Sequence, residues 1–226
     1  RILPIIFLLG LVISLVGPAQ AINLAKNGKT SYVIAIPANP IPVEKTAATE
    51  LRNHLKLISG ADFKIISEKN TGSRKNIIFV GQTALAKKAL AGTDWKALGN
   101  DGIILRTINN KIILTGGRKR GGLYAVYTFL EDVVGVRWWS HNESYIPKKP
   151  NLNIDKLNIK YIPKILCREA HFFEPNVYGI YAARTKQTGH FHPVPAEYGG
   201  HYNILGWCHT FYQLLPPDKY FKDHPE

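Results

Sequence analysis

The sequence contains no methionine and only two cysteines among its 226 residues. Because an initiating methionine is missing, we expect that the first codon or codons are absent and that the chain is a fragment at this end. Cys167 and Cys208 have neither the C-x-x-C spacing of a redox motif nor the paired spacing of a zinc site. We interpret them as buried free thiols, and a disulfide formed in an oxidising compartment is the alternative.

The sequence also lacks an apolar run long enough to span a bilayer comfortably, which takes about 20 residues. Its longest apolar run, Ile2 to Val16, follows the basic residue Arg1 and precedes the small-residue site Ala19-Gln20-Ala21. This order is typical of a secretory signal peptide. We therefore predict a signal peptide over residues 1–21, a secreted or periplasmic protein that begins near Ile22, and no membrane span after cleavage. An uncleaved membrane anchor is the alternative.

Acidic residues are scarce, since 16 Asp and Glu face 29 Lys and Arg, which gives a net charge of +13. Such a surplus favours acidic partners, namely nucleic acid, an anionic membrane or an acidic polysaccharide. Export makes nucleic acid the least favoured of the three, and we predict no nucleic-acid partner. A solvated surface with a high isoelectric point is the alternative interpretation.

Familiar nucleotide and metal motifs are absent as well. The glycine-rich run 116–122 could bind an anion through backbone N–H groups at a helix start, but it lacks the patterns of a P-loop and of a dinucleotide site. We therefore favour a tight strand-to-helix turn with a solvated basic surface. H-E-x-x-H does not occur, and His190, His192, His201 and His209 match no established metal spacing. We predict no metal and no cofactor.

Apolar periodicity predicts alternating strands and helices after the signal peptide. We expect strands at 31–36, 63–66, 76–81, 101–107, 111–116 and 136–139, and helices at 43–59, 83–90 and 122–134. The strands 101–107 and 111–116 are joined by Asn109-Asn110, as in a β-hairpin. The order of elements predicts the α/β class, with helices packed on a mixed sheet.

The chain changes character after residue 150. Residues 22–150 are expected to form one small α/β domain, and the segment 151–163, which lies among prolines and lysines, is predicted to connect it to a second domain. Histidines and aromatic residues are concentrated from Ile165 onward. Residues 164–226 are therefore expected to carry most of the chemistry.

Two short apolar runs that end in polar residues occur at 165–170 and 205–210. If both are neighbouring parallel strands, Arg168, Glu169 and His209 lie at their carboxyl ends, which form the active-site face of a (β/α)₈ (TIM) barrel. Trp207 could stack on a sugar ring or lie deeper in the barrel. The alternative is that Arg168 and Glu169 form a structural ion pair and Trp207 belongs to the core.

Several segments carry a resemblance to known families. They are Glu50–Gly60, Ile77–Gly81, Asp101-Gly102-Ile103, Gly116 with Arg120–Glu131, and Gly135–Trp138. This pattern resembles the N-terminal domain of α-glucuronidases, which is similar to the small α/β domain before the barrel of β-hexosaminidases. The later segments Trp207–Thr210, Leu215–Pro217 and Tyr220–Glu226 resemble a bacterial family of secreted proteins of unassigned function. In that family an α-glucuronidase-like domain precedes a glycosidase-like barrel.

The resemblance implies an incomplete barrel over residues 164–226 and a parent protein that hydrolyses a polysaccharide, such as one that contains uronic acids. Arg168, Glu169, Trp207 and His209 are the expected substrate-binding residues. A barrel needs about 250 residues, so the two carboxylates that a glycosidase requires are expected beyond Glu226, and the fragment itself is expected to be inactive. The alternative is a non-catalytic carbohydrate-binding or cell-surface protein.

Overall fold

The structure is a computed structural model, and it describes residues 21–206 and 210–221. The predicted signal peptide, except Ala21, lies outside the described residues, as do Trp207, Cys208 and His209. Cys167 is half-buried and is a free thiol among the described residues. The alternative of a disulfide between Cys167 and Cys208 stays a prediction. In the described part of the chain, no helix has both the length and the hydropathy needed to cross a membrane.

A mixed sheet of six strands forms the centre of the body, which we define as residues 21–161. Its order is β10-β5-β6-β4-β2-β3. The strands β3, β2, β4 and β6 run parallel to one another, whereas β5 pairs with β6 and β10 pairs with β5 in antiparallel fashion. The strands are β2 (Val33–Ile36), β3 (Ile65–Ser67), β4 (Ile77–Val80), β5 (Ile103–Ile108), β6 (Lys111–Gly116) and β10 (Asn158–Tyr161).

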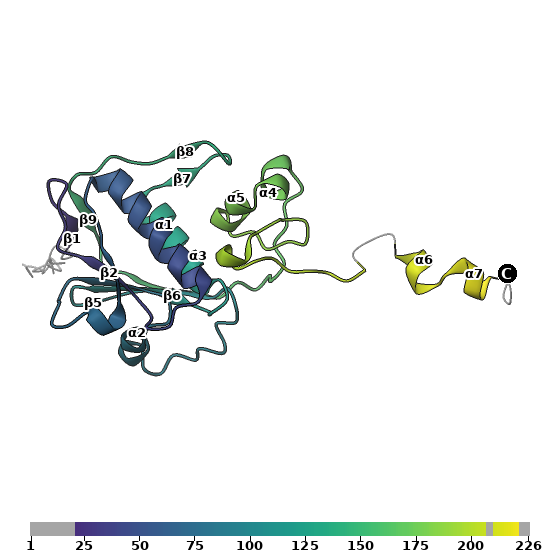
Figure 1. Cartoon of the computed structure of the whole chain (residues 1–226), viewed down its shortest axis with the longest axis horizontal. Coiled ribbons are helices and arrows are strands. Elements are labelled where there is room, and N and C mark those ends of the chain that lie inside the picture. Colours follow the sequence, from purple (N-terminus) through teal and green to yellow (C-terminus); the bar gives the residue numbers. More distant parts are fainter. Residues whose placement is uncertain (1–20, 207–209, 222–226) are drawn as a thin grey trace, which may run out of the picture.

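Two short ribbons flank this sheet: β1 (Ile22–Ala25) with β9 (Leu152–Ile154), and β7 (Arg137–Trp138) with β8 (Ser144–Tyr145). Helices α1 (Pro42–Ser59) and α3 (Gly121–Thr128) cover one face of the sheet, and α2 (Ala84–Ala89) lies on the other (Figure 1). The sheet with helices on both faces confirms the predicted α/β class.

Helix α1 forms where the apolar spacing predicts it. Pro42 occupies its first turn, where a missing N–H costs nothing, and the Glu44 carboxylate accepts the N–H of Ile41 at 3.0 Å. Gly60 ends the helix in the left-handed conformation, with φ of 78°. All five residues of the predicted apolar face are buried: Val43, Ala47, Leu51, Leu55 and Ile58. The helix is therefore held by both caps and by its contact with the sheet.

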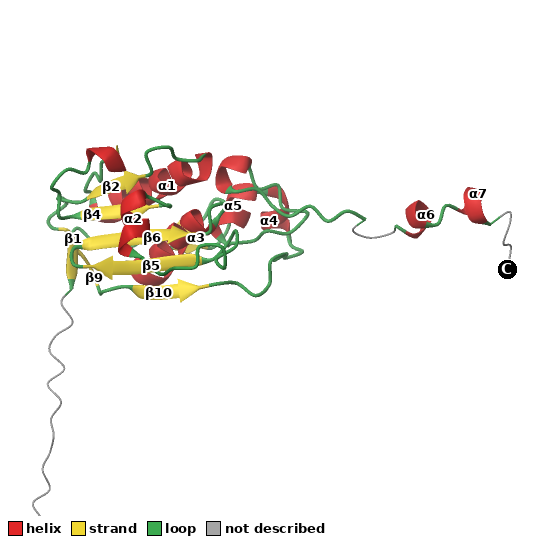
Figure 2. Cartoon of the chain, turned by 90° about the horizontal axis from the view of Figure 1, so that it is seen from below, coloured by secondary structure: helices red, strands yellow, loops and turns green. Residues whose placement is uncertain are grey.

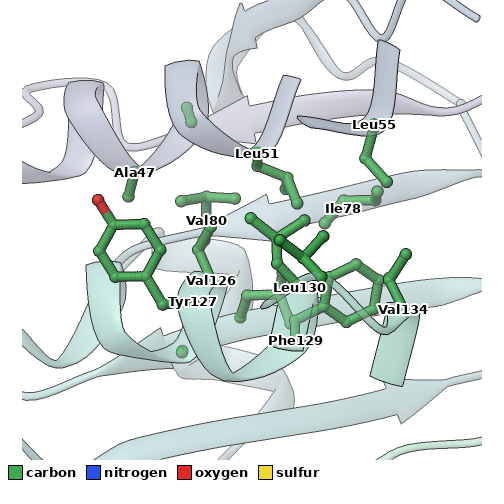
Figure 3. Packing of buried hydrophobic residues seen from close by; sticks show 14 of the residues in the cluster. Ala47, Leu51, Leu55, Ile78, Val80, Val126, Tyr127, Phe129, Leu130 and Val134 are labelled. Carbon is green, nitrogen blue, oxygen red and sulfur yellow. The ribbon is translucent and has the colours of Figure 1, made fainter. Parts of the chain in front are cut away.

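The helix predicted over 122–134 is buried on every side in its first part, α3, rather than on one face only. Every residue of α3 is buried, and the chain continues as a π-helical segment, η2 (Phe129–Val134), that ends at Gly135. Figure 3 shows Val126, Phe129 and Leu130 gathered with side chains of α1 around the strand residues Ile78 and Val80. Burying a side chain of this size contributes about 1.5–3 kcal/mol, so this layer is the main apolar core.

The segment predicted as a connection between domains, residues 151–163, is structured. It contains β9, which pairs with β1, and β10, which extends the six-stranded sheet beside β5. Leu152, Ile154 and Leu157 are buried. These strands are too short and too interrupted by polar residues to appear as a periodic run, so the sheet of the body extends to Tyr161.

The segment from 164 to 206, which we call the docked segment, contains helices and no strand among its residues. The helices are α4 (Phe173–Val177), α5 (Gly179–Arg184) and the 3₁₀ turn η3 (Ala196–Tyr198). The run 165–170, expected as a barrel strand, is a loop here. The backbone N–H of Arg168 donates to the side-chain hydroxyl of Thr188, and the backbone N–H of Thr188 donates to the carbonyl oxygen of Arg168, so these bonds are made to a loop and not to a neighbouring strand. The barrel therefore stays a prediction.

Two further short helices, α6 (Phe211–Leu214) and α7 (Pro217–Tyr220), follow the docked segment. Both lie away from the body in the two views (Figures 1 and 2), and all their side chains are exposed.

Candidate functional site

A cavity of about 470 Å³ lies where the docked segment meets the body. Its floor comes from the start of β5, from β10 and from the outer side of α3 and η2, and the docked segment forms the remaining wall. The lining residues are Asp101, Ile103, Tyr124, Thr128, Asp132, Ile159, Tyr161, Pro163, Arg168, Thr185, Lys186 and Gln187.

A buried carboxylate, Asp101, joins the two sides of this cavity. Its Oδ1 atom accepts from Nε of Arg120 at 2.6 Å, and its Oδ2 atom accepts from Nη2 of Arg168 at 3.0 Å. The side chains of Asp101 and Arg120 are 1% and 0% exposed. Charges so deeply buried are tolerated only when they are paired, so Asp101 requires both guanidinium groups to stay in place.

The glycine-rich run explains how Arg120 reaches this position. A Cβ atom on Gly116 or Gly121 would lie 2.1 or 2.2 Å from the carbonyl oxygen of Gly102, so only glycine permits the approach. The predicted tight strand-to-helix turn is confirmed. The predicted solvated basic surface is only partly correct, because Arg118 and Lys119 are exposed whereas Arg120 is fully buried.

Arg168 borders the cavity, as a binding residue should, but most of its donors are occupied. Besides its bond to Asp101, its Nε donates to the carbonyl oxygen of Lys186 at 2.8 Å and its Nη1 to that of Ile165 at 2.8 Å. The guanidinium lies 5.8 Å from the ring centre of Tyr124, whose pKa is raised by burial. The Arg168 side chain is still 24% exposed, so it presents a fixed cationic edge to the cavity.

Glu169, the neighbouring predicted site residue, turns away from the cavity. Its Oε1 accepts the backbone N–H of Phe191 at 2.8 Å. It packs so tightly against Gly189 that a Cβ atom there would lie 2.5 Å from Glu169. The alternative of an Arg168–Glu169 ion pair is wrong, because the carboxylate that pairs with Arg168 belongs to Asp101. Trp207 and His209 lie outside the described residues.

Two more carboxylates of the body hold the docked segment. Glu50 on α1 accepts hydrogen bonds from Arg184 and from the Tyr127 hydroxyl, all at 3.2 Å. Glu131 accepts from Nζ of Lys186 at 2.6 Å. Sequence reasoning missed Asp101, Glu50 and Glu131, although the occurrence of Glu50 beside the apolar stripe of α1 was a local sign of a buried partner.

The histidines of the docked segment make hydrogen bonds within its loops. His192 is buried, which lowers its pKa, and its Nε2 accepts the N–H of Ala170 at 3.4 Å. His190 accepts the N–H of Ile204 at 3.1 Å through Nδ1, and His201 contacts Asn203 at 3.1 Å. Within residues 21–206 and 210–221, no group of three or more His, Cys, Asp or Glu side chains could hold a metal ion.

Two parts of the chain match known protein families. Residues 20–129 match the family described as "Glycosyl hydrolase family 67 N-terminus", and residues 138–226 match "Domain of unknown function (DUF4838)". The body is thus a small α/β domain that is similar, over residues 20–129, to the N-terminal part of family 67 glycosyl hydrolases. The chain has an α-glucuronidase-like N-terminal domain, as its sequence pattern indicated.

A solved structure described as "a novel family GH115 4-O-Methyl-alpha-glucuronidase, BtGH115A, with specificity for decorated arabinogalactans" is similar to this chain at 21% identity and a TM-score of 0.44. The match covers 65% of this chain and 19% of the other. This likeness is too distant to say anything about a substrate. No curated protein matches the chain.

Proposed function

We propose that this chain is the N-terminal part of an exported glycoside hydrolase that acts on a polysaccharide containing glucuronic acid. The observation that carries the proposal is the match of residues 20–129 to a domain named for its place at the N-terminus of glycosyl hydrolases. The α/β body, to which the docked segment is held by ion pairs, is consistent with that place.

We propose that the docked segment binds sugar in the cavity beside Asp101. Arg168 offers a guanidinium edge that suits a carboxylate or vicinal hydroxyl groups. The exposed carboxylate of Asp132 can accept hydrogen bonds from hydroxyls, and the exposed ring of Tyr161 offers a flat apolar face. We include His209 and Trp207 in this proposal on their sequence position alone, and Glu169 as a residue that shapes the adjoining loop.

Hydrolysis of a glycosidic bond needs two carboxyl groups, one to protonate the leaving oxygen and one to act as nucleophile or base. Asp101 cannot supply either role, since both of its oxygens are held by guanidinium groups. We therefore propose that the catalytic pair comes from residues that follow Glu226 in the parent protein, and that the 226-residue chain does not hydrolyse sugars by itself.

The test compares this chain with the gene product that includes its continuation. Both are incubated with glucuronoxylan and with an aryl glucuronide, and released sugar is measured. The proposal expects release by the longer product and none by the chain. Hydrolysis by neither protein, together with retained binding of the polysaccharide, would support the alternative of a non-catalytic carbohydrate-binding protein.

Export has a separate test. The parent protein is expressed with its native start, and the mature protein is isolated from outside the cytoplasm and sequenced from its N-terminus. We expect the mature chain to begin within a few residues of Ile22. Retention of Arg1 would support an uncleaved anchor instead.

A further inference from the structure

Three hollows surround the turn between β5 and β6. Their volumes are about 480, 440 and 310 Å³, and Asn109 lines all three. They are bounded by the loop 72–75, by α2 and by the residues just before β10. The turn stands between them as a ridge, with Asn109 in the left-handed conformation at φ of 53°.

The charged residues that line these hollows are all basic. They are Arg74, Lys75, Lys88, Lys111 and Lys156, and each side chain is exposed. No Asp or Glu is among the described residues that line the three hollows. None of the five cations takes part in an ion pair found in the described part of the chain. A group of cations that outnumbers the carboxylates around it produces a positive potential that attracts anions.

These hollows lie at the opposite end of the strands from the Asp101 cavity. Strand β6 runs from Lys111 at the turn to Gly116 beside Gly102 and Gly121, so at 3.3 Å per residue the two ends are about 17 Å apart. In Figure 2 the arrowhead of β5 points away from α4 and α5, toward the turn. The three hollows and the Asp101 cavity are therefore separate surfaces.

The side chains here suit a ligand that has both carboxylates and hydroxyls. Nη1 of Arg74 donates to the carbonyl oxygens of Asn70 and Thr71 at 2.9 and 3.3 Å, which orients its guanidinium group. Asn23, Asn76, Asn109 and Asn110 add amides, which both donate and accept hydrogen bonds with hydroxyls.

We propose that the three hollows together form a binding surface for an acidic polysaccharide. Separate cations around a ridge match a polymer that carries one carboxylate per sugar better than a single compact anion. The aromatic residues in the lining, Tyr32 and Phe79, are buried, so no exposed ring is offered for stacking of nucleic-acid bases. The surface stands beside the proposed hydrolase function and would attach the protein to its polysaccharide without cleaving it.

The test uses the full chain and polygalacturonate, a polymer with one carboxylate per sugar, in affinity gel electrophoresis. Polygalacturonate should retard the native protein, whereas uncharged dextran should not, and added salt should weaken the retardation. In the double variant Lys75→Glu, Lys111→Glu we expect binding to weaken by about tenfold or more, because two attractive charges become repulsive. The neutral variant Lys75→Gln, Lys111→Gln should fall between the two.

Lys119→Glu is the control, since it changes an exposed lysine that lies beyond the far end of β6. It should bind polygalacturonate nearly as well as the native protein does. The proposal is overturned if the native protein does not bind, or if the double variant binds equally well. Tighter binding of double-stranded DNA or of anionic lipid vesicles through the same lysines would also overturn it. Hydrolysis is measured separately, so its absence leaves this result unaffected.

Discussion

The body and the docked segment are held by different forces. The body has a continuous apolar core in which α1 and α3 pack on the sheet, and its largest buried side chains are mostly aliphatic or aromatic. The docked segment buries few apolar residues, chiefly Tyr181, Ala182, Ala183 and Val194. Its attachment depends on ion pairs with Asp101, Glu50 and Glu131.

This difference indicates which part of the chain specifies its own structure. Apolar burial is non-directional and is available to any well-patterned segment, so the body can form from local periodicity. Ion pairs stabilise only when both partners are already close, and removing one partner leaves a buried charge. We therefore expect the docked segment to depend on the body, whereas the body depends little on the docked segment.

The largest effect on the attachment of the docked segment to the body is expected from Asp101→Asn. This substitution leaves Arg120 buried without its counter-ion and releases Arg168, so we expect a loss of about 3–5 kcal/mol, the usual cost of breaking a buried ion pair. The free energy of unfolding is measured by chemical denaturation. Amide hydrogen exchange should increase more over residues 165–202 than over α1, where it follows only the loss of global stability. Unchanged exchange in the docked segment would mean that Asp101 does not hold it.

A core substitution should act on the body instead. Leu130→Ala removes a side chain that is 0% exposed, and such a change costs about 2–5 kcal/mol. Leu57→Ala is the control, because Leu57 lies on α1 but is 51% exposed, and it should change stability by less than about 0.5 kcal/mol. Thermal denaturation of the two variants distinguishes the positions. Equal losses would show that the η2 face is not part of the core.

The ion pair of Glu50 tests the docked segment at a second point. Arg184→Ala removes two bonds to a mostly buried carboxylate, and because Arg184 is 22% exposed we expect a loss of only about 1–2 kcal/mol. Limited proteolysis should become faster within α4 and α5. Arg52→Ala breaks a more exposed pair with Asp62, whose side chains are 41% and 43% exposed, and should cause no measurable loss. A larger loss of stability in Arg52→Ala than in Arg184→Ala would contradict this comparison.

The smallest expected effect is a pH dependence. Burial lowers the pKa of His54 below its ordinary value of 6.5. Between the two pKa values the unfolded chain binds more protons, so His54 makes the free energy of unfolding decrease as the pH falls below about 6.5. His54→Gln should reduce this slope between pH 7 and 5, whatever its effect on the stability above pH 7. Denaturation curves across this range would contradict the assignment if native and variant slopes are equal.

Local patterns in the sequence predict the body well. The helix over 43–59, the hairpin at Asn109-Asn110 and the α/β class are confirmed, because each depends on residues close together in the chain. Strands β9 and β10 could not be predicted, since they are three and four residues long and depend on partners far away in the sequence. Their pairing with β1 and β5 is decided by tertiary packing.

The candidate site was predictable only in part. Arg168 lines a cavity, and its role in substrate binding stays a prediction. Its partner Asp101 lies 67 residues away, and a periodic pattern in the sequence does not reveal a contact over that separation. Arg120 was misread as a surface residue because it stands in a run of basic residues. Its glycine neighbours were the available sign, since they allow the backbone to approach another strand end closely.

The glycine turn before α3 also limits how this protein can change by mutation. At Gly116, Gly117 and Gly121 even a methyl group would lie 2.1 or 2.2 Å from a backbone oxygen. Every single-nucleotide change of a glycine codon that alters the residue adds at least that methyl group. These three positions are therefore closed to one-step variation, while Arg118 and Lys119 between them remain open to it. A library of random variants selected for folding should retain sequence diversity at the two basic positions and lose it on either side.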